Sequence, residues 1–206
     1  IYPVLKLSAK ANCLDSSVEV SGTYRKERQI FNAELSGLDV MNVLPLLPDG
    51  TLPDGIEVLG GTVMKAKVAG QYMGSQLSFS GQAEYEGGSV KVKETQVDDI
   101  HGFISFTDAE ALLSADAEAA GQQAHVNGKV RYDTGAPYLD LHVASDSFDP
   151  SKVLKDIPYE GAAAVKAHVT GTAADPVADG TVRVASGTAA GIPFANARAH
   201  VRYEDG

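Results

Sequence analysis

The residues of this chain best suited to acid–base or metal chemistry are five histidines: His101, His125, His142, His168 and His200. In the sequence, zinc sites are usually recognised by Cys and His ligands that are separated by about two to five residues. None of these histidines stands at such a spacing from Cys13 or from another histidine. Three of them fall on the polar side of alternating segments. We therefore interpret the histidines as solvated strand residues and expect no metal site and no cofactor.

The carboxylates and hydroxyls also form no recognisable catalytic set. Asp98 and Asp99 are adjacent, and adjacent strand residues face opposite ways, so we expect this pair in a turn or exposed loop. Asp146 and Asp149 flank a turn and weakly suggest a calcium site. Helix capping explains Asp149 without a metal. No nucleophile elbow, phosphate-binding loop or HExxH motif occurs, and the Ser, His and Asp residues suggest no triad. We expect that the chain is not an enzyme.

Composition excludes further classes of protein. The 206 residues carry a formal net charge of −10, which argues against nucleic-acid binding and against adhesion to an anionic membrane surface. Apolar residues make up 44% and Trp is absent, so the interior must be largely aliphatic. The single Cys13 cannot form an internal disulfide, and we interpret it as a small filler near a strand. No apolar run approaches the ~18 residues of a membrane helix.

Alternation with a period of two dominates the chain and predicts antiparallel strands that have one apolar and one polar face. Near the C-terminus, for example, Ala197, Ala199 and Val201 alternate with Arg198 and His200. Turn signals recur about every 8–15 residues, which predicts roughly a dozen strands. Residues 107–120 also suit a helix, because they are rich in Ala and Leu. Their alternation leads us to predict a strand.

Two short helices are predicted. Asp149 can cap a helix over residues 151–155, with Pro150 at the favoured first position. Asp39 can cap a second helix over residues 40–44 in the same way. The Pro-rich residues 45–59 that follow are predicted to be an inserted loop.

A long internal repeat organises the chain. Residues 60–70 read again as residues 161–171, with five of eleven positions identical, and a second shared phrase precedes each copy. Such a repeat indicates stacked units that form one continuous domain. We predict partial N-terminal strands of a truncated repeat over 1–32, a first unit with the insert at 45–59 over 33–120, and a second unit over 121–206.

The apolar face of these strands must be buried somewhere. A closed barrel, a two-sheet sandwich and a sheet curled into a trough remain open. The small inward residues suit either closely pressed sheets or a groove with room for an acyl chain. The candidates for lining such a groove are Met64, Ala66, Val68, Leu77, Phe79, Val126, Val130, Leu139, Leu141, Val143, Val165, Ala167, Val169, Val182, Val184, Ala197, Ala199 and Val201.

The second unit resembles the repeat region of TamB and its AsmA-like relatives. The resemblance rests on a short Asp-capped helix, a strand that closes in Gly-Thr, an Asp-Pro step, and a Gly-x-Pro-Phe phrase before an alternating strand. These elements are Asp149 to Leu154, Gly171 and Thr172, Asp175 and Pro176, and Gly191, Pro193 and Phe194. The first unit departs from the pattern, because it lacks the Asp-Pro step after Gly70 and carries the insert.

The resemblance implies a mainly β fold in which an elongated antiparallel sheet curls into a trough, often called a β-taco. It implies a periplasm-spanning parent protein, anchored in the inner membrane of a two-membrane bacterium. The missing initiator Met and the turn-like end at residues 203–206 lead us to expect that this chain is an excised piece of a longer protein. The resemblance further implies that phospholipid acyl chains move along the groove between the membranes. TamB is also implicated in outer-membrane protein assembly, with a barrel protein of the TamA/BamA type as partner. A dozen strands would span about 55 Å.

Two other functions stay open. Within the same kind of protein, the segment could act as a rigid spacer or as a chaperone-like surface whose open edge binds client strands. An unrelated β-rich adhesin or glycan-binding module is the further alternative. Such modules usually display surface aromatics for stacking on sugars, and this chain has no Trp.

Overall fold

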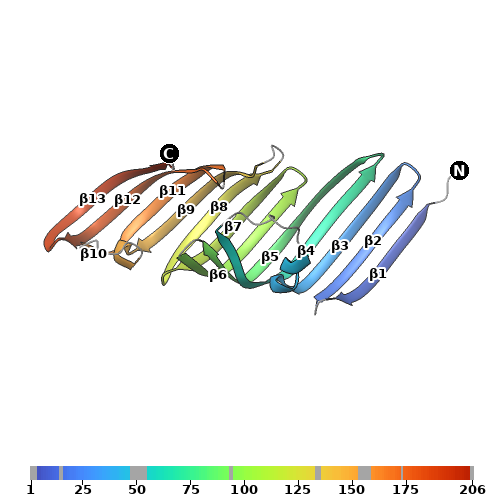
Figure 1. The fold of residues 1–206 in the computed structure, drawn as a ribbon, viewed down its shortest axis with the longest axis horizontal. Helices are drawn as coiled ribbons and strands as arrows, with labels where there is room; N and C mark the ends of the chain where they lie inside the picture. Colours follow the sequence, from blue (N-terminus) through green and yellow to red (C-terminus); the bar gives the residue numbers. More distant parts are fainter. Residues whose placement is uncertain are drawn as a thin grey trace.

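The computed structural model describes residues 4–13, 16–46, 55–92, 95–132, 136–152, 159–172 and 174–204. Within these residues the chain forms one 13-stranded antiparallel sheet (Figure 1). The predicted mainly β fold is confirmed. The strands are β1 (Leu5–Cys13), β2 (Ser16–Arg25), β3 (Arg28–Asp39), β4 (Ile56–Met73), β5 (Gln76–Val92), β6 (Thr95–Thr107), β7 (Glu110–Ala119), β8 (Gln122–Arg131), β9 (Tyr138–Phe148), β10 (Tyr159–Glu160), β11 (Ala163–Thr172), β12 (Pro176–Ala189) and β13 (Ile192–Glu204).

Nearly every strand pairs with the strand that follows it in the sequence. The exception is β10, whose two residues pair with the end of β12, so that β11 pairs directly with β9. Two hairpins have two-residue turns in which both residues take positive φ, namely Ala120 (51°) with Gly121 (73°) and Ala190 (50°) with Gly191 (77°). These dihedrals suit the right-handed twist of the flanking strands.

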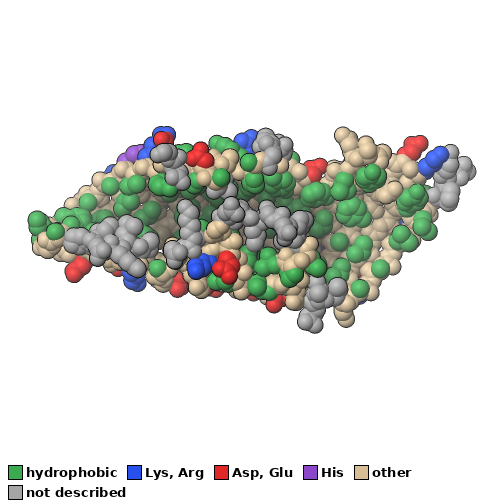
Figure 2. Space-filling model, viewed as in Figure 1, with side chains coloured by type: hydrophobic (Ala, Val, Ile, Leu, Met, Phe, Trp, Pro, Cys, Tyr) green, Lys and Arg blue, Asp and Glu red, His purple; other side chains and the backbone are tan. Residues whose placement is uncertain are grey.

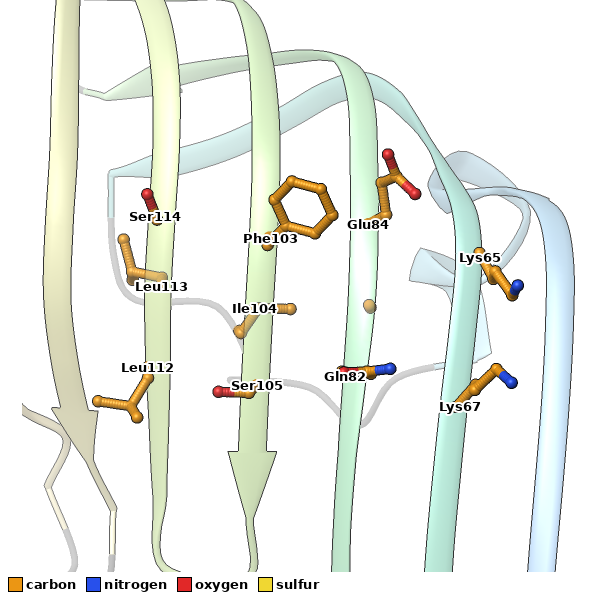
Figure 3. A pocket seen from close by; sticks show the side chains of 11 residues that line it. Lys65, Lys67, Gln82, Glu84, Phe103, Ile104, Ser105, Leu112, Leu113 and Ser114 are labelled. Atoms are coloured by element: carbon orange, nitrogen blue, oxygen red, sulfur yellow. The ribbon is translucent and has the colours of Figure 1, made fainter.

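The sheet is curled but not closed, and the strands stack along its long axis (Figure 1). The pairing slips in register at several places. Register shifts interrupt β4–β5 near Gly60 and Val63, β5–β6 near Gly88, and β6–β7 between Asp98 and His101. Bulges of this kind bend a strand and increase its twist. Figure 3 shows β4 and β5 bending and passing behind β6 and β7.

The two predicted helices are single 3₁₀ turns: η1 (Val40–Asn42), followed by η2 (Leu44–Leu46), and η3 (Pro150–Lys152). The predicted caps are present. An oxygen of Asp39 accepts a hydrogen bond from the Met41 amide at 2.9 Å, and Asp149 accepts one from the Ser151 amide at 3.0 Å. Since Pro45 has no amide hydrogen to donate, the turn at 40–42 does not extend into a regular helix. Residues 153–155 lie outside the described residues.

The prediction of a strand within 107–120 is confirmed, because β7 occupies Glu110–Ala119. The predicted loop at 45–59 is wrong at its end. Residues 56–59 belong to β4, where Ile56 and Val58 pair with Val92 and Val90 of β5. The prolines caused the predicted loop to be extended too far toward the C-terminus. The apolar alternation resumes directly after Gly55. Residues 47–54 lie outside the described residues.

The two copies of the repeat occupy equivalent places in the sheet. In the first copy, β3 ends at the Asp39-capped turn η1 and pairs with β4; in the second, β9 is followed by the Asp149-capped turn η3 and pairs with β11. Each phrase also has a glycine of unusual conformation at its start, Gly61 with a φ of 136° and Gly161 with a φ of 141°, although Gly161 aligns with Gly60. The shared sequence phrases therefore correspond to a shared strand–turn–strand unit.

Candidate functional site

One face of the sheet is a continuous apolar surface. Cross-strand partners share a face, so the pairing register shows which side chains lie side by side. A single row runs from β2 to β13 without a charged residue: Val18, Leu35, Ala66, Ala83, Ile104, Leu113, Gly128, Leu141, Val169, Ala178 and Tyr203. Figure 2 shows hydrophobic side chains, in green, gathered on a hollowed, elongated face. We call this face the trough.

The sequence-predicted lining residues are distributed along the trough at different degrees of burial. Val184 is buried at 8% exposure, and the four most exposed are Met64, Leu77, Ala199 and Val201. The half-buried ones are Ala66, Val68, Phe79, Val126, Val130, Leu139, Leu141, Val143, Val165, Ala167, Val169, Val182 and Ala197. Neighbours across the pairing include Val126 with Val143, and Val182 with Ala199.

Met64 is the residue whose place differs most from a simple alternation. It lies in the register shift between Val63 and Lys65, and its exposed fraction is 43%. On the N-terminal side of this shift Val63, one residue out of phase with Ala66, pairs with Tyr85, which lies on the trough face with Ala83. The bulge therefore shifts the alternation of β4 by one residue, so that the odd-numbered Val63 faces the trough before it and the even-numbered Ala66 after it. Alternation alone does not reveal this shift.

The apolar face is not a closed hydrophobic core. Among the described residues, the buried apolar side chains are only Ala111, Ala163 and Val184. The packed interior of a soluble domain normally buries most of its large aliphatic residues. Here, most of the trough stays half-buried, and contiguous apolar surface of this kind is typical of surfaces that bind a ligand or a partner.

Aromatic side chains in the trough lie against glycines of neighbouring strands. The ring of Phe31 covers Gly70, and the ring of Phe106 covers Gly81, where an added Cβ would stand 2.5 Å from Phe106 Cζ. Tyr85 covers Gly61 in the same manner and donates a hydrogen bond to the Gly60 carbonyl at 2.7 Å. Because the rings lie along the sheet, they add apolar surface without extending across the trough.

The sequence analysis missed several lining residues at the bent end of the sheet. Val58, Val90 and Val97 pair in series with Ala119, and so belong to the same face as Ala115. The bulges near Gly60 and Gly88 hid them, because each shifts the alternation by one position. Their own local alternation, as in Val90 and Val92 around Lys91, was the available signal.

Two further lining residues, Ile104 and Phe106, lie in an almost entirely apolar stretch of β6. There the apolar neighbour Phe103 lies on the opposite face, paired with Glu84 and Ser114. Phe103 and Leu112, with Lys65 and Lys67, line an outer hollow of about 380 Å³ (Figure 3). An apolar run of this kind gives no face assignment from sequence alone.

The outer face carries the charged and polar side chains. Lys67 and Glu34 form an ion pair at 3.0 Å, and the hydrogen bond from Lys67 lowers the pKa of the Glu34 carboxyl. Asp98 lies within β6 at the register shift, not in a turn or loop as predicted, and Asp99 there takes a positive φ of 49°. Hydrogen bonds from Gln96 and then Ser89 lower the pKa of Asp98.

Three histidines on this outer face pair with carboxylates on adjacent strands. The pairs are His125 with Asp116 at 2.9 Å, His168 with Asp140 at 2.7 Å, and His200 with Asp179 at 3.1 Å. His142 stacks on His168, with ring centroids 4.4 Å apart. The hydrogen bond from His168 is the main cause that lowers the pKa of Asp140. Strand pairing brings these groups together, in the case of His168 and Asp140 across a separation of 28 residues.

Comparisons with protein-family models, with curated proteins and with solved structures gave no match. No helix in the described part of the chain has the length and hydrophobicity to cross a membrane.

Proposed function

We propose that the trough holds phospholipid acyl chains, and that this chain is a non-catalytic segment of a TamB/AsmA-like conduit. The observation that carries the proposal is the uncharged row from Val18 to Tyr203, which is half-buried from β2 to β12. If this surface were an ordinary packed core, we would expect other side chains to cover it.

The chemistry of the row suits a ligand that slides. Burial of each acyl methylene is favourable by about 0.8 kcal/mol, wherever along an aliphatic surface it occurs. Aliphatic side chains and glycines make no directional bonds that would hold the ligand at one position. The rings of Phe31 and Phe106 lie against glycines and so leave space above the sheet for the chain.

The cellular setting belongs to the same proposal. In it, the parent protein is anchored in the inner membrane, spans the periplasm and delivers phospholipid to the outer membrane. An outer-membrane barrel of the TamA/BamA type is the proposed partner at the far end. The sequence resemblance over residues 121–206 and the open trough both support this setting.

Lipid extraction tests the proposal with a matched pair of variants. Val182 is half-buried in the trough and Thr181, its neighbour on β12, is exposed on the outer face. Mass spectrometry of organic extracts should find phospholipid with the wild-type protein and with Thr181→Asp, and much less with Val182→Asp. Circular dichroism checks that all three are folded. Equal lipid in the two variants, or none in the wild type, would contradict the proposal.

A second function is favoured by the edges of the sheet. Among the described strands, β1 pairs with β2 alone and β13 with β12 alone. Edge strands offer free backbone groups to which a client strand can add. Hydrogen exchange with an added outer-membrane strand peptide tests this function. Protection confined to β13 or β1 supports it, and unchanged exchange at both edges contradicts it.

A further inference from the structure

Three potential metal ligands meet on the outer face of β9 and β11. They are Asp140 and His142, two positions apart on β9, and His168, which stands directly opposite His142 on β11. One ligand atom from each side chain lies within 4.8 Å of the other two. The site is on the opposite face of the sheet from Leu141 and Val143, so it is separate from the trough.

The two imidazoles lie next to each other on this face. Their rings are 4.4 Å apart and within 12° of parallel, and Asp140 Oδ1 lies 2.7 Å from His168 Nε2. Ligand atoms about 2.0–2.2 Å from a tetrahedral Zn²⁺ ion are separated by roughly 3.4 Å. Small side-chain rotations at this half-exposed surface therefore suffice to close the set around an ion.

This cluster differs from the other histidine–carboxylate pairs. The His125–Asp116 pair has one imidazole and one carboxylate, and so has the His200–Asp179 pair. This is the usual composition of a surface ion pair. Only the pair at His168 has a second imidazole stacked on it, among the residues that the structure describes. Two imidazoles and one carboxylate with an open position suit a metal that prefers nitrogen ligands.

We propose that Asp140, His142 and His168 bind one divalent transition-metal ion, with Zn²⁺ as the representative. Water completes the coordination, or Asp179, which stands opposite His168 in β12. The ion then joins β9 to β11. These paired strands are separated in the sequence by η3 and β10, so the metal fixes a strand pairing that no direct hairpin joins.

The test uses the metal-free chain and Zn²⁺ alone, titrated against a chromogenic chelator at neutral pH. We expect one equivalent to bind with micromolar affinity. His142→Ala and His168→Ala should each weaken this binding by at least roughly tenfold. His125→Ala is the matched control and should bind like the wild type, because it removes an outer-face histidine from a simple ion pair.

A second measurement uses the wild-type protein alone and so does not depend on whether a variant folds. In NMR spectra, one equivalent of Zn²⁺ should shift the imidazole protons of His142 and His168 and leave those of His101 and His125 unchanged. Similar shifts at all histidines would overturn the proposal. So would equal Zn²⁺ affinity in the wild type and His168→Ala, or no binding below millimolar concentration. None of these readouts depends on lipid, so the metal site can fail or stand independently of the proposed conduit.

Discussion

The ring of Phe31 on β3 lies directly over Gly70 on β4, at the position where any side chain on residue 70 would stand. Gly70 is one of the few buried positions of the trough. The contact explains why the repeated sequence phrase ends in glycine in its first copy. It also keeps a large aromatic residue flat against the sheet.

Replacement of Gly70 by Ala should therefore destabilise the fold. The added Cβ would overlap the Phe31 ring, and overpacking of this kind costs roughly 1–3 kcal/mol of unfolding free energy. The neighbouring substitution Ala69→Val, at an exposed position of the outer face, should change it by less than about 0.5 kcal/mol. Urea denaturation of both variants measures the difference. Equal unfolding free energies would show that the ring is not held over Gly70.

Tyr85 should make the stability of the fold sensitive to alkaline pH. Burial, and next the negative charge of Asp39, raise the pKa of Tyr85 above its ordinary value of 10.0. Because the folded-state pKa is the higher one, the contribution of Tyr85 is fully present below about pH 10. It is lost as the pH rises through the raised folded-state pKa.

The comparison of wild type with Tyr85→Phe isolates this effect. Tyr132, whose pKa burial also raises, is present in both proteins and cancels. The wild type should lose more unfolding free energy than Tyr85→Phe when the pH is increased from about 9 to 12. Parallel pH profiles would mean that Tyr85 ionises equally easily in the folded and unfolded states.

The hairpin turn between β7 and β8 should be open to improvement. Ala120 takes a φ of 51° there, although a Cβ disfavours this region and Asn tolerates it. Ala120→Asn should therefore raise the unfolding free energy by roughly 0.5–1 kcal/mol. Thermal denaturation measures the gain. Gly121→Ala, at a φ of 73°, should have the opposite sign, and a gain in that variant would contradict the assigned turn.

The sequence predicted the strands well because alternation is a local property. Over the predicted lining residues of β8, β9 and β11 to β13 the phase is unbroken, and the register shift of β9 against β11 falls beyond Val143, so these residues could be assigned from the sequence alone. In β4 and β5 the bulges at Gly60 and Gly88 change the phase, and Val58 and Val90 were missed. No composition or spacing reports such a shift.

The cluster on the outer face escaped prediction for a different reason. His142 and His168 are far apart in the sequence, and only the register of β9 with β11 places them opposite each other. Asp140 and His142 alternate with apolar residues in the expected way, but alternation does not say which strands are neighbours. Partner strands and register come from the complete fold.

The most direct test of the trough as a lipid site uses the absence of Trp from the chain. A single tryptophan at position 182 or 181 provides a unique fluorophore on the inner or the outer face of β12. With phospholipid brominated in its acyl chains, we predict strong quenching in Val182→Trp and little in Thr181→Trp. Equal quenching at both positions, or none at position 182, would contradict the account of the trough as a conduit for acyl chains.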